Sequence, residues 1–263
     1  MRIFLLLFIT AVLSDLHDLK YVKSKDKFVR LVTQRSGYAC SVILIANYLF
    51  FTNQVAQPPY ELNKVSDEDL IGVLQSFLDE RLNSSQDFDK PLIKRIRDDI
   101  PRYTQGMYAN IGFKSNLDFG STEGVNPREV FSAFGLILIH SWVVDPEDTE
   151  LISSLEYYSK ISGSKDDSPY FDDVVMGLQI DQSMGYTDTS RFEIAYKFIK
   201  GSQRSAYGVE KMKETMENNQ YYAFIHADHY SLCFKNTLQF DSVVVYLDNG
   251  ESDPVMRWRV LKF

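Results

Sequence analysis

The order of helical and strand-like segments along the chain is the feature that most restricts its fold. Four segments before residue 220 have apolar residues at helical spacing or a sequence typical of a helix start: residues 40–51, 66–83, 126–140 and 205–219. Three later segments are rich in aromatic and β-branched residues and are separated by turns: residues 221–227, 229–236 and 240–250. These three segments predict an antiparallel meander. Helices followed by strands indicate an α+β domain.

The remaining stretches supply shorter elements and connections. Residues 20–27 form a charged lead-in, residues 28–34 a short strand, and residues 35–39 a turn. Residues 162–168, which are rich in serine, aspartate and glycine, predict a surface loop. The chain has no internal repeat, no low-complexity tract and no stretch typical of a linker between domains. We therefore expect a single folded domain.

The N-terminus has the layout of a secretory signal peptide. Arg2 precedes an apolar core of eleven residues, 3–13, and a small residue, Ser14, follows it. The run is too short to span a bilayer, so we expect no stable membrane insertion once it is removed. The alternative is a buried N-terminal helix or strand. We expect residues 1–14 to be the leader and residues 15–263 to be the folded domain.

Composition excludes several classes of function. Hydrophobic residues make up 44% of the 263 residues, which is enough for a sizeable core. The net charge is -8 and there is no long basic run, which argues against nucleic acid as a partner. Two cysteines cannot build a disulfide framework, and the four histidines show no zinc-ligand spacing. We therefore predict no metal site and no cofactor.

Cys40 stands where a nucleophilic cysteine could act. Its predicted place is a helix N-terminus after a turn, where the helix dipole and free backbone N–H groups stabilise a thiolate. Gln34, just upstream, offers a side-chain amide that could help the backbone N–H of Cys40 to hold an oxyanion. His229, at the start of a predicted strand, could serve as the base. The alternative is a buried, inert thiol, because free cysteine is among the most buried residue types.

Three segments, in this order, resemble the MINDY family of deubiquitinases, which are papain-like cysteine peptidases. The family pattern TQNENGPCPLLAIMNILF is matched by TQRSGYACSVILIANYLF at residues 33–50, which keeps Thr33, Gln34, Cys40 and Asn47. The family's SVFDLLGIPLYHGWLVDP is matched by REVFSAFGLILIHSWVVDP, and its FFRNNHFS by AFIHADHYS. The resemblance extends from about residue 19 to about residue 250.

The resemblance implies a papain-like fold. In that fold an N-terminal helical half places the catalytic cysteine at a helix N-terminus, and a C-terminal antiparallel sheet carries the histidine. Cys40 is then the nucleophile, Gln34 the oxyanion donor and His229 the general base. Trp142 matches a tryptophan that helps to hold ubiquitin in the family, and a core or surface aromatic is the alternative for this position.

Two further assignments are needed near the base. His226 ends the preceding predicted strand, across a short turn from His229, and we expect its side chain to point away from the site. The position that holds a small polar residue in the family falls on Leu247, so Asp248 beside it is the candidate for orienting the base. His140 is expected to be a structural histidine near the end of a helix.

The implied activity is thiol-dependent hydrolysis of isopeptide bonds in polyubiquitin, with a preference for 48-linked chains. We expect a monomer whose partner is polyubiquitin. Two alternatives stay open: a ubiquitin-binding pseudoenzyme with weak turnover, and a papain-like enzyme that acts on another substrate. If the leader is a signal peptide, the protein is exported and Asn83 is a possible glycosylation acceptor. Otherwise the protein is cytoplasmic, where the family acts.

Overall fold

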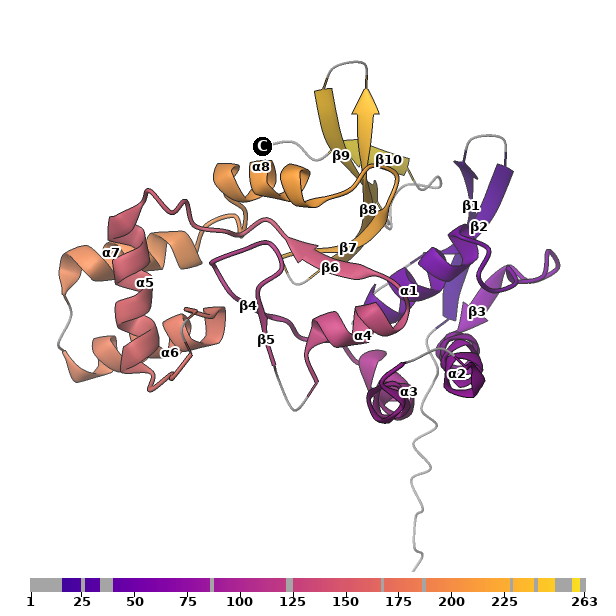
Figure 1. Ribbon diagram of the computed structural model, residues 1–263, viewed down its shortest axis with the longest axis horizontal. Coiled ribbons are helices and arrows are strands. Elements are labelled where there is room, and N and C mark those ends of the chain that lie inside the picture. The colour runs from indigo at the N-terminus through magenta and orange to yellow at the C-terminus, as the bar shows by residue number, and fades with distance from the viewer. Residues whose placement is uncertain are drawn as a thin grey trace, which may run out of the picture.

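The computed structural model describes most of the chain: residues 16–24, 27–33, 40–85, 88–121, 125–166, 168–185, 188–227, 229–238, 241–248 and 257–260. The predicted leader, residues 1–14, lies outside the described residues. In Figure 1 a sheet lies in the middle of the molecule, with one group of helices on the left and a group of helices and strands on the right. This mixture of helices and small sheets agrees with the α+β class that the sequence predicts.

The central sheet has the strand order β10-β9-β8-β7-β6. Its strands are β6 (Ile137–His140), β7 (Tyr221–His226), β8 (His229–Leu238), β9 (Asp241–Asp248) and β10 (Arg257–Val260). Strands β7, β8 and β9 form the predicted antiparallel meander, and β10 continues it. Strand β6 joins the other edge and runs parallel to β7. The C-terminal meander is thus confirmed, with one strand added from far upstream in the sequence.

Helix α1 (Cys40–Phe51) has the predicted bounds and packs against one face of the central sheet. Ten of its twelve residues are buried. A helix that is apolar on every side is stable only when other elements surround it. Side chains from β7 and β8 share its hydrophobic cluster: Ala223, Ile225, Tyr230 and Leu232.

Helix α8 (Ala206–Thr215) covers the opposite face of the sheet (Figure 1). Met212 and Met216 pack with Tyr222, Phe224 and Cys233 in a second hydrophobic cluster. The side chains of β7 and β8 therefore alternate between α1 and α8, as the two-residue period of a strand requires. The helix lies within the predicted range but is shorter than predicted.

Helices α2 (Asp67–Asn83) and α3 (Lys90–Tyr103) pack against α1, and α4 (Pro127–Ala133) packs against α3. The predicted helix starts are confirmed. Ser66 caps α2 by accepting from the backbone N–H of Asp69, and Asn126 caps α4. Asn83, the possible glycosylation acceptor, is the last residue of α2 and is exposed.

The prediction of one helix over residues 126–140 is wrong in its second half. Helix α4 ends at Ala133, and Gly135 has a φ of +81°, a left-handed conformation that glycine adopts readily. The apolar residues that follow form β6, so His140 ends a strand instead of a helix. An apolar run alone does not distinguish a buried strand from a buried helix, and here the pairing with β7 decides.

Strands β1 (Leu16–Ser24), β2 (Lys27–Val32) and β3 (Lys64–Ser66) form a second sheet with the order β2-β1-β3. The prediction of a charged lead-in over residues 20–27 is wrong, because most of that range belongs to β1. β1 pairs with β2 on one side and with β3 on the other. These pairings stabilise β1 as a strand, although its charged residues do not predict one. Two short strands, β4 (Asn110–Ile111) and β5 (Phe119–Gly120), pair with each other.

The helices α5 (Thr149–Ile161), α6 (Phe171–Met184) and α7 (Thr189–Ile199) form the group on the left of Figure 1. The predicted surface loop joins α5 to α6, and its described residues contain neither helix nor strand. Within the described segments, no helix combines the length and the apolar composition needed to cross a bilayer.

Gly177 sets how closely α5 and α6 pack, and its replacement by alanine will destabilise the protein. A Cβ at Gly177 would overlap the backbone carbonyl of Tyr158 in α5. Because backbone must move to make room, we expect the free energy of unfolding to fall by about 1–3 kcal/mol in urea titration. Gly72 in α2 is the matched control, since a Cβ there would meet no described atom within 4 Å. Gly72→Ala should stabilise slightly, and equal effects of the two substitutions would contradict this account.

Candidate active site

Cys40 is the first residue of α1 and is buried, with 6% of its surface exposed. It therefore occupies the helix N-terminus that the sequence predicts. The first backbone N–H groups of a helix have no partner within it, and together with the helix dipole they favour a thiolate. The first turn of α1 contains no acidic residue that would oppose this effect. The local geometry thus suits an ionised sulfur.

His229 is the first residue of β8 and is exposed. Tyr48 and Phe51, late in α1, contact the ring of Tyr221 at the start of β7, with centroid distances of 6.3 and 5.2 Å. Helix α1 therefore runs antiparallel to β7, and each element is roughly 16 Å long at the usual rise per residue. Cys40 consequently lies near the end of the sheet where β7 ends and β8 begins. The fold brings the starts of α1 and β8 to the same end of the sheet.

His226 and His229 are directly opposed in the β7–β8 hairpin. Opposed residues project from the same face of a sheet, so the short turn does not separate the directions of the two side chains, and the expectation that His226 points away from the site stays a prediction. Their surroundings differ instead. The Nε2 atom of His226 donates to the carbonyl of Ser202 (2.8 Å), its ring stacks on Phe224, and burial lowers its pKa. The ring of His226 is thus held in place, whereas His229 is exposed.

Side-chain alternation places His229 on the face of the sheet that carries Ser231 and Cys233. Helix α8 covers that face, and α1 covers the other. To reach Cys40, the side chain of His229 therefore has to extend around the end of the sheet. As the first residue of β8, His229 is placed at that end.

The predicted oxyanion donor, Gln34, lies outside the described residues, as does the rest of residues 34–39. The described chain stops at Thr33, one residue after β2, and resumes at Cys40. Along the chain, the segment that carries Gln34 therefore connects β2 of the second sheet to α1.

Asp248, the candidate for orienting the base, is the last residue of β9. Strands β8 and β9 are antiparallel, and Cys233 is paired with Tyr246. Continuing this register puts Asp248 opposite Ser231, two residues along β8 from His229. This position is compatible with a role beside the base, and that role stays a prediction.

Trp142 lies in the core between α5–α7 and the central sheet. Only 2% of its surface is exposed, and its ring contacts the rings of Phe113, Phe198 and Phe171 at centroid distances of 5.0, 5.4 and 5.5 Å. Trp142 therefore occupies a core position, which is one of the two alternatives that the sequence leaves open. A direct contact of this side chain with ubiquitin would require the core around it to open, and the role in holding ubiquitin stays a prediction.

His140 is structural, as expected, but it acts through a hydrogen bond that the sequence does not reveal. It is fully buried, and its Nδ1 accepts from the backbone N–H of Trp142 (3.1 Å). Burial lowers the pKa of His140 to about 4, with the Asp118 carboxylate opposing this shift. The ring is therefore neutral at physiological pH, and protonation of Nδ1 would break the bond to Trp142.

This depressed pKa predicts acid sensitivity. The neutral ring stabilises the fold fully above pH 6.5, and this contribution is lost as the pH falls from about 6.5 towards 4, because the unfolded state binds the proton more readily. The free energy of unfolding should fall by up to about 1.4 kcal/mol per pH unit from this group alone. Urea unfolding of the wild type and of His140→Phe across this range tests the prediction. The variant should have the shallower pH dependence, and parallel curves would contradict the assignment.

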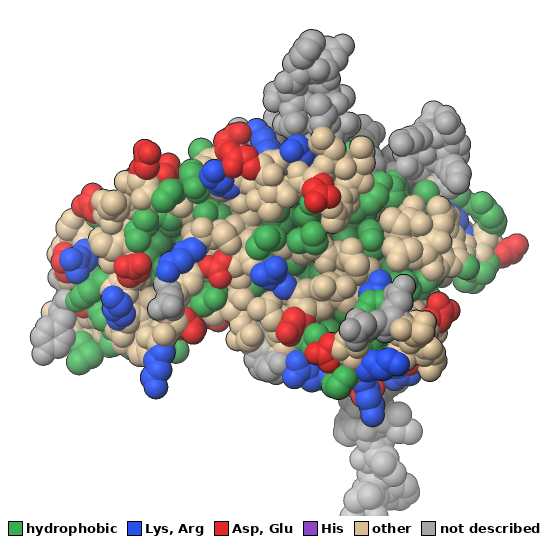
Figure 2. All heavy atoms as spheres, viewed as in Figure 1, with side chains coloured by type: hydrophobic (Ala, Val, Ile, Leu, Met, Phe, Trp, Pro, Cys, Tyr) green, Lys and Arg blue, Asp and Glu red, His purple; other side chains and the backbone are tan. Residues whose placement is uncertain are grey.

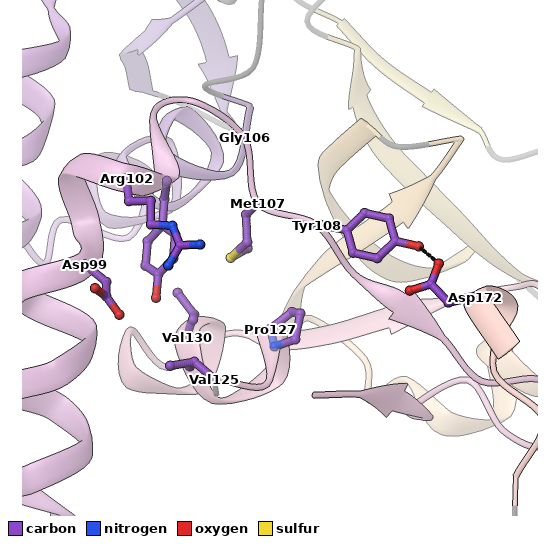
Figure 3. A pocket seen from close by; sticks show the side chains of 10 residues that line it. Asp99, Arg102, Gly106, Met107, Tyr108, Val125, Pro127, Val130 and Asp172 are labelled. Atoms are coloured by element: carbon purple, nitrogen blue, oxygen red, sulfur yellow. Dashed lines mark hydrogen bonds between the residues drawn. The ribbon is translucent and has the colours of Figure 1, made fainter. Parts of the chain in front are cut away.

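A pocket of about 540 Å³ lies beside the strand that carries His229. The hydroxyl of Tyr230, the next residue, donates to the carbonyl of Met107 (3.0 Å), and Met107 lines the pocket. Figure 3 shows the lining side chains and the hydrogen bond between Tyr108 and Asp172 (2.5 Å). Sequence reasoning missed this pocket because its residues converge from separate segments that carry no recognisable motif.

The surface in Figure 2 mixes charges of both signs. Acidic and basic side chains are interspersed with exposed apolar ones across this face. Among the described residues seen there, the basic side chains form no continuous stripe of the kind that tracks a nucleic acid backbone.

Comparison with known proteins gives consistent matches. The family model described as MINDY deubiquitinase matches residues 15–247. Ubiquitin carboxyl-terminal hydrolase MINDY-1 of Bos taurus is 27% identical over 150 residues, which cover 54% of this chain and 30% of that protein. Ubiquitin carboxyl-terminal hydrolase MIY1 of Saccharomyces cerevisiae is 24% identical over 228 residues, covering 82% of this chain and 60% of that protein. The chain thus spans less than two thirds of the length of either relative.

Proposed function

The chain belongs to the MINDY deubiquitinase family, and on this premise we propose that it is a thiol-dependent hydrolase of isopeptide bonds in polyubiquitin. The observation that carries the proposal is the position of Cys40 at a helix N-terminus, at the end of the sheet where the strand of His229 begins. A papain-like peptidase needs its cysteine and its histidine within hydrogen-bond reach of each other, and a shared end of the sheet supports this. Because both come from one chain, the proposed site needs no residue from a second copy, and we propose that the enzyme acts as a monomer.

In the proposed reaction the Cys40 thiolate attacks the carbonyl carbon of the C-terminal glycine of ubiquitin. Gln34 and the backbone N–H of Cys40 donate hydrogen bonds to the oxyanion that forms. His229, oriented by Asp248, gives its proton to the departing lysine amine, and the C–N bond breaks. The same histidine then takes a proton from the water that hydrolyses the thioester, which releases ubiquitin and restores the Cys40 thiolate beside a protonated His229.

A second candidate function is a ubiquitin-binding pseudoenzyme. One observation favours it: side-chain alternation puts His229 on the sheet face that α1 does not cover. Turnover then requires the His229 side chain to reach Cys40 around the end of the sheet. A protein in which His229 seldom reaches Cys40 would bind ubiquitin but cleave it slowly.

Cleavage of ubiquitin tetramers of defined linkage tests the proposal, with binding of the same chains measured in parallel. We expect 48-linked tetramers to be shortened faster than 63-linked ones, with no dependence on added metal. Binding without cleavage would support the pseudoenzyme instead. Absence of both binding and cleavage would reject ubiquitin as the substrate, and would direct attention to another substrate of a papain-like enzyme.

A further inference from the structure

A groove of about 600 Å³ opens between α2, α3, α4 and the start of β6 (Figure 1), and it shares no lining residue with the pocket beside β8. The hydroxyl of Tyr48 in α1 donates to the carbonyl of Gly135 (3.3 Å), in the turn that leads into β6. Tyr48 is eight residues after Cys40, or about 12 Å along the helix axis. The groove therefore lies towards the other end of α1 from the candidate nucleophile.

Arg81, in the last turn of α2, lines this groove with its hydrogen-bonding capacity unused. Its Cζ atom lies 4.8 Å from the ring centroid of Phe88 and 5.1 Å from that of Phe77, so two aromatic rings hold the guanidinium. Within the described part of the chain, the side chain of Arg81 makes no hydrogen bond and no ion pair. Its five N–H donors are thus available to a ligand.

Partial burial makes this guanidinium receptive to an anion. Burial lowers the pKa of Arg81, with Tyr48 opposing this shift. The charge has therefore lost part of its hydration without gaining a carboxylate partner from the described residues. A bound carboxylate would replace the lost hydration through two parallel N–H···O bonds, which is the geometry that a planar guanidinium offers.

A second arginine and two carboxylates complete the charged lining. Arg128, in the first turn of α4, is exposed and forms no ion pair with a described residue. The two carboxylates cap helices: Asp89 accepts from the backbone N–H of Leu92 (3.0 Å), and Glu129 accepts from that of Asn126 (3.1 Å). Backbone N–H groups at helix starts offset these negative charges. The positive charges of the two arginines have no such offset.

Most of the remaining wall of the groove is apolar. It is lined by Leu92 and Ile93 of α3 and by Leu136, Ile137 and Leu138 at the start of β6. Ile137 is exposed, so a ligand that covers it removes apolar surface from water. The groove therefore suits a ligand that combines a carboxylate with apolar groups, and a segment of protein supplies both.

We propose that this groove binds a short segment of a partner protein in which an acidic side chain has apolar neighbours. The carboxylate pairs with Arg81 and Arg128, and the neighbouring apolar side chains pack against α3 and Ile137. Because the groove lies away from Cys40, such a partner binds without occupying the candidate active site. The inference does not depend on the proposed function.

Binding of a designed peptide tests the proposal. The probe is a fluorescently labelled, acetylated and amidated peptide of alternating leucine and glutamate, titrated with the full chain. We expect saturable binding that weakens as sodium chloride is added, since charges are paired. Replacing the glutamates with glutamine, or Arg81→Gln in the protein, should weaken binding by about tenfold or more. Arg81→Lys keeps the charge but loses the planar fork, and it should weaken binding by about threefold or more.

Arg191 provides the matched control. Its Cζ atom also lies over an aromatic ring, 4.9 Å from the centroid of Tyr157, but it forms an ion pair with Asp188 (3.8 Å). Arg191→Gln should leave peptide binding within about twofold of the wild type. If Arg81→Gln is too unstable to test, Arg128→Gln decides, because this side chain is exposed; it should weaken binding by about threefold or more.

Five results would overturn the proposal. The wild type could fail to bind the glutamate peptide, or it could bind the glutamine peptide equally well. Displacement of the peptide by inorganic phosphate alone would show an unspecific anion site. Tighter binding of a glutamine peptide with a free C-terminus would assign the groove to a chain end. A dimer of the chain that Arg81→Gln dissociates, measured by sedimentation, would make a second copy the occupant.

Discussion

Replacement of Cys40 with alanine will abolish covalent labelling by an electrophilic ubiquitin probe, whereas replacement of Cys233 will leave labelling intact. Cys40 begins a helix, where backbone N–H groups that have no partner inside the helix and the helix dipole favour a thiolate. Cys233 is fully buried between the sheet and α8, and this burial raises the pKa of its thiol far above the usual range. A thiol that stays protonated and has no access to solvent does not attack the probe. The adduct is measured as a mass increase of the intact protein.

The unfolding temperature of both variants is measured alongside, because Cys233→Ala leaves a small cavity in a packed cluster. Retention of the adduct in Cys40→Ala would exclude Cys40 as the nucleophile. Loss of the adduct in a folded Cys233→Ala variant would show that the buried thiol takes part after all.

His229→Ala will be nearly inactive, with turnover reduced by about two to four powers of ten and binding of polyubiquitin almost unchanged. In the proposed mechanism this imidazole supplies the proton that the leaving amine needs, and His229 is the first residue of β8, a strand that contacts α1. The measurement is cleavage of 48-linked tetramers, with the affinity for the same chains determined separately. A loss confined to affinity would contradict a role as general base.

His226→Ala is the control for His229→Ala. His226 projects from the same face of the hairpin, but its ring is committed to the carbonyl of Ser202. Loss of that bond should cost about 1 kcal/mol of unfolding free energy and leave most of the activity. If His226→Ala were the inactive variant, the match of this hairpin to the histidine segment of the family would have to be shifted by three residues.

The elements that the sequence predicted well are those with local causes. The apolar spacing of residues 40–51 defines α1, and the caps at Ser66 and Asn126 define the starts of α2 and α4. Each signal lies within a few residues of the feature it determines. The place of Cys40 at a helix N-terminus follows from the same local pattern.

The sequence-based predictions fail where contacts between segments distant in the sequence determine the local structure. Strand β6 exists because it pairs with β7, and β1 is held by β2 and β3. The hairpin register, which opposes His226 to His229, depends on the whole length of β7 and β8 and not on the residues around the turn. The burial of Trp142, which the sequence left open between a core position and a contact with ubiquitin, depends on three aromatic rings from separate segments. No local pattern in the sequence reports such contacts.

The pairing of β6 with β7 has a consequence for how the chain folds. Ile137 and Tyr222 are paired although they are 85 residues apart (222 − 137), so the edge of the central sheet closes a long loop. The entropic cost of closing a loop rises only slowly with the length of the loop. Contacts between residues that are distant in the sequence nevertheless slow folding. Helices α5, α6 and α7 lie inside this loop and pack on one another. If this group forms before β6 pairs with β7, the length of chain that remains to be closed into a loop is shorter. These three helices, which lie on the other side of the molecule from α1 (Figure 1), would thus shorten the search by which the central sheet is completed.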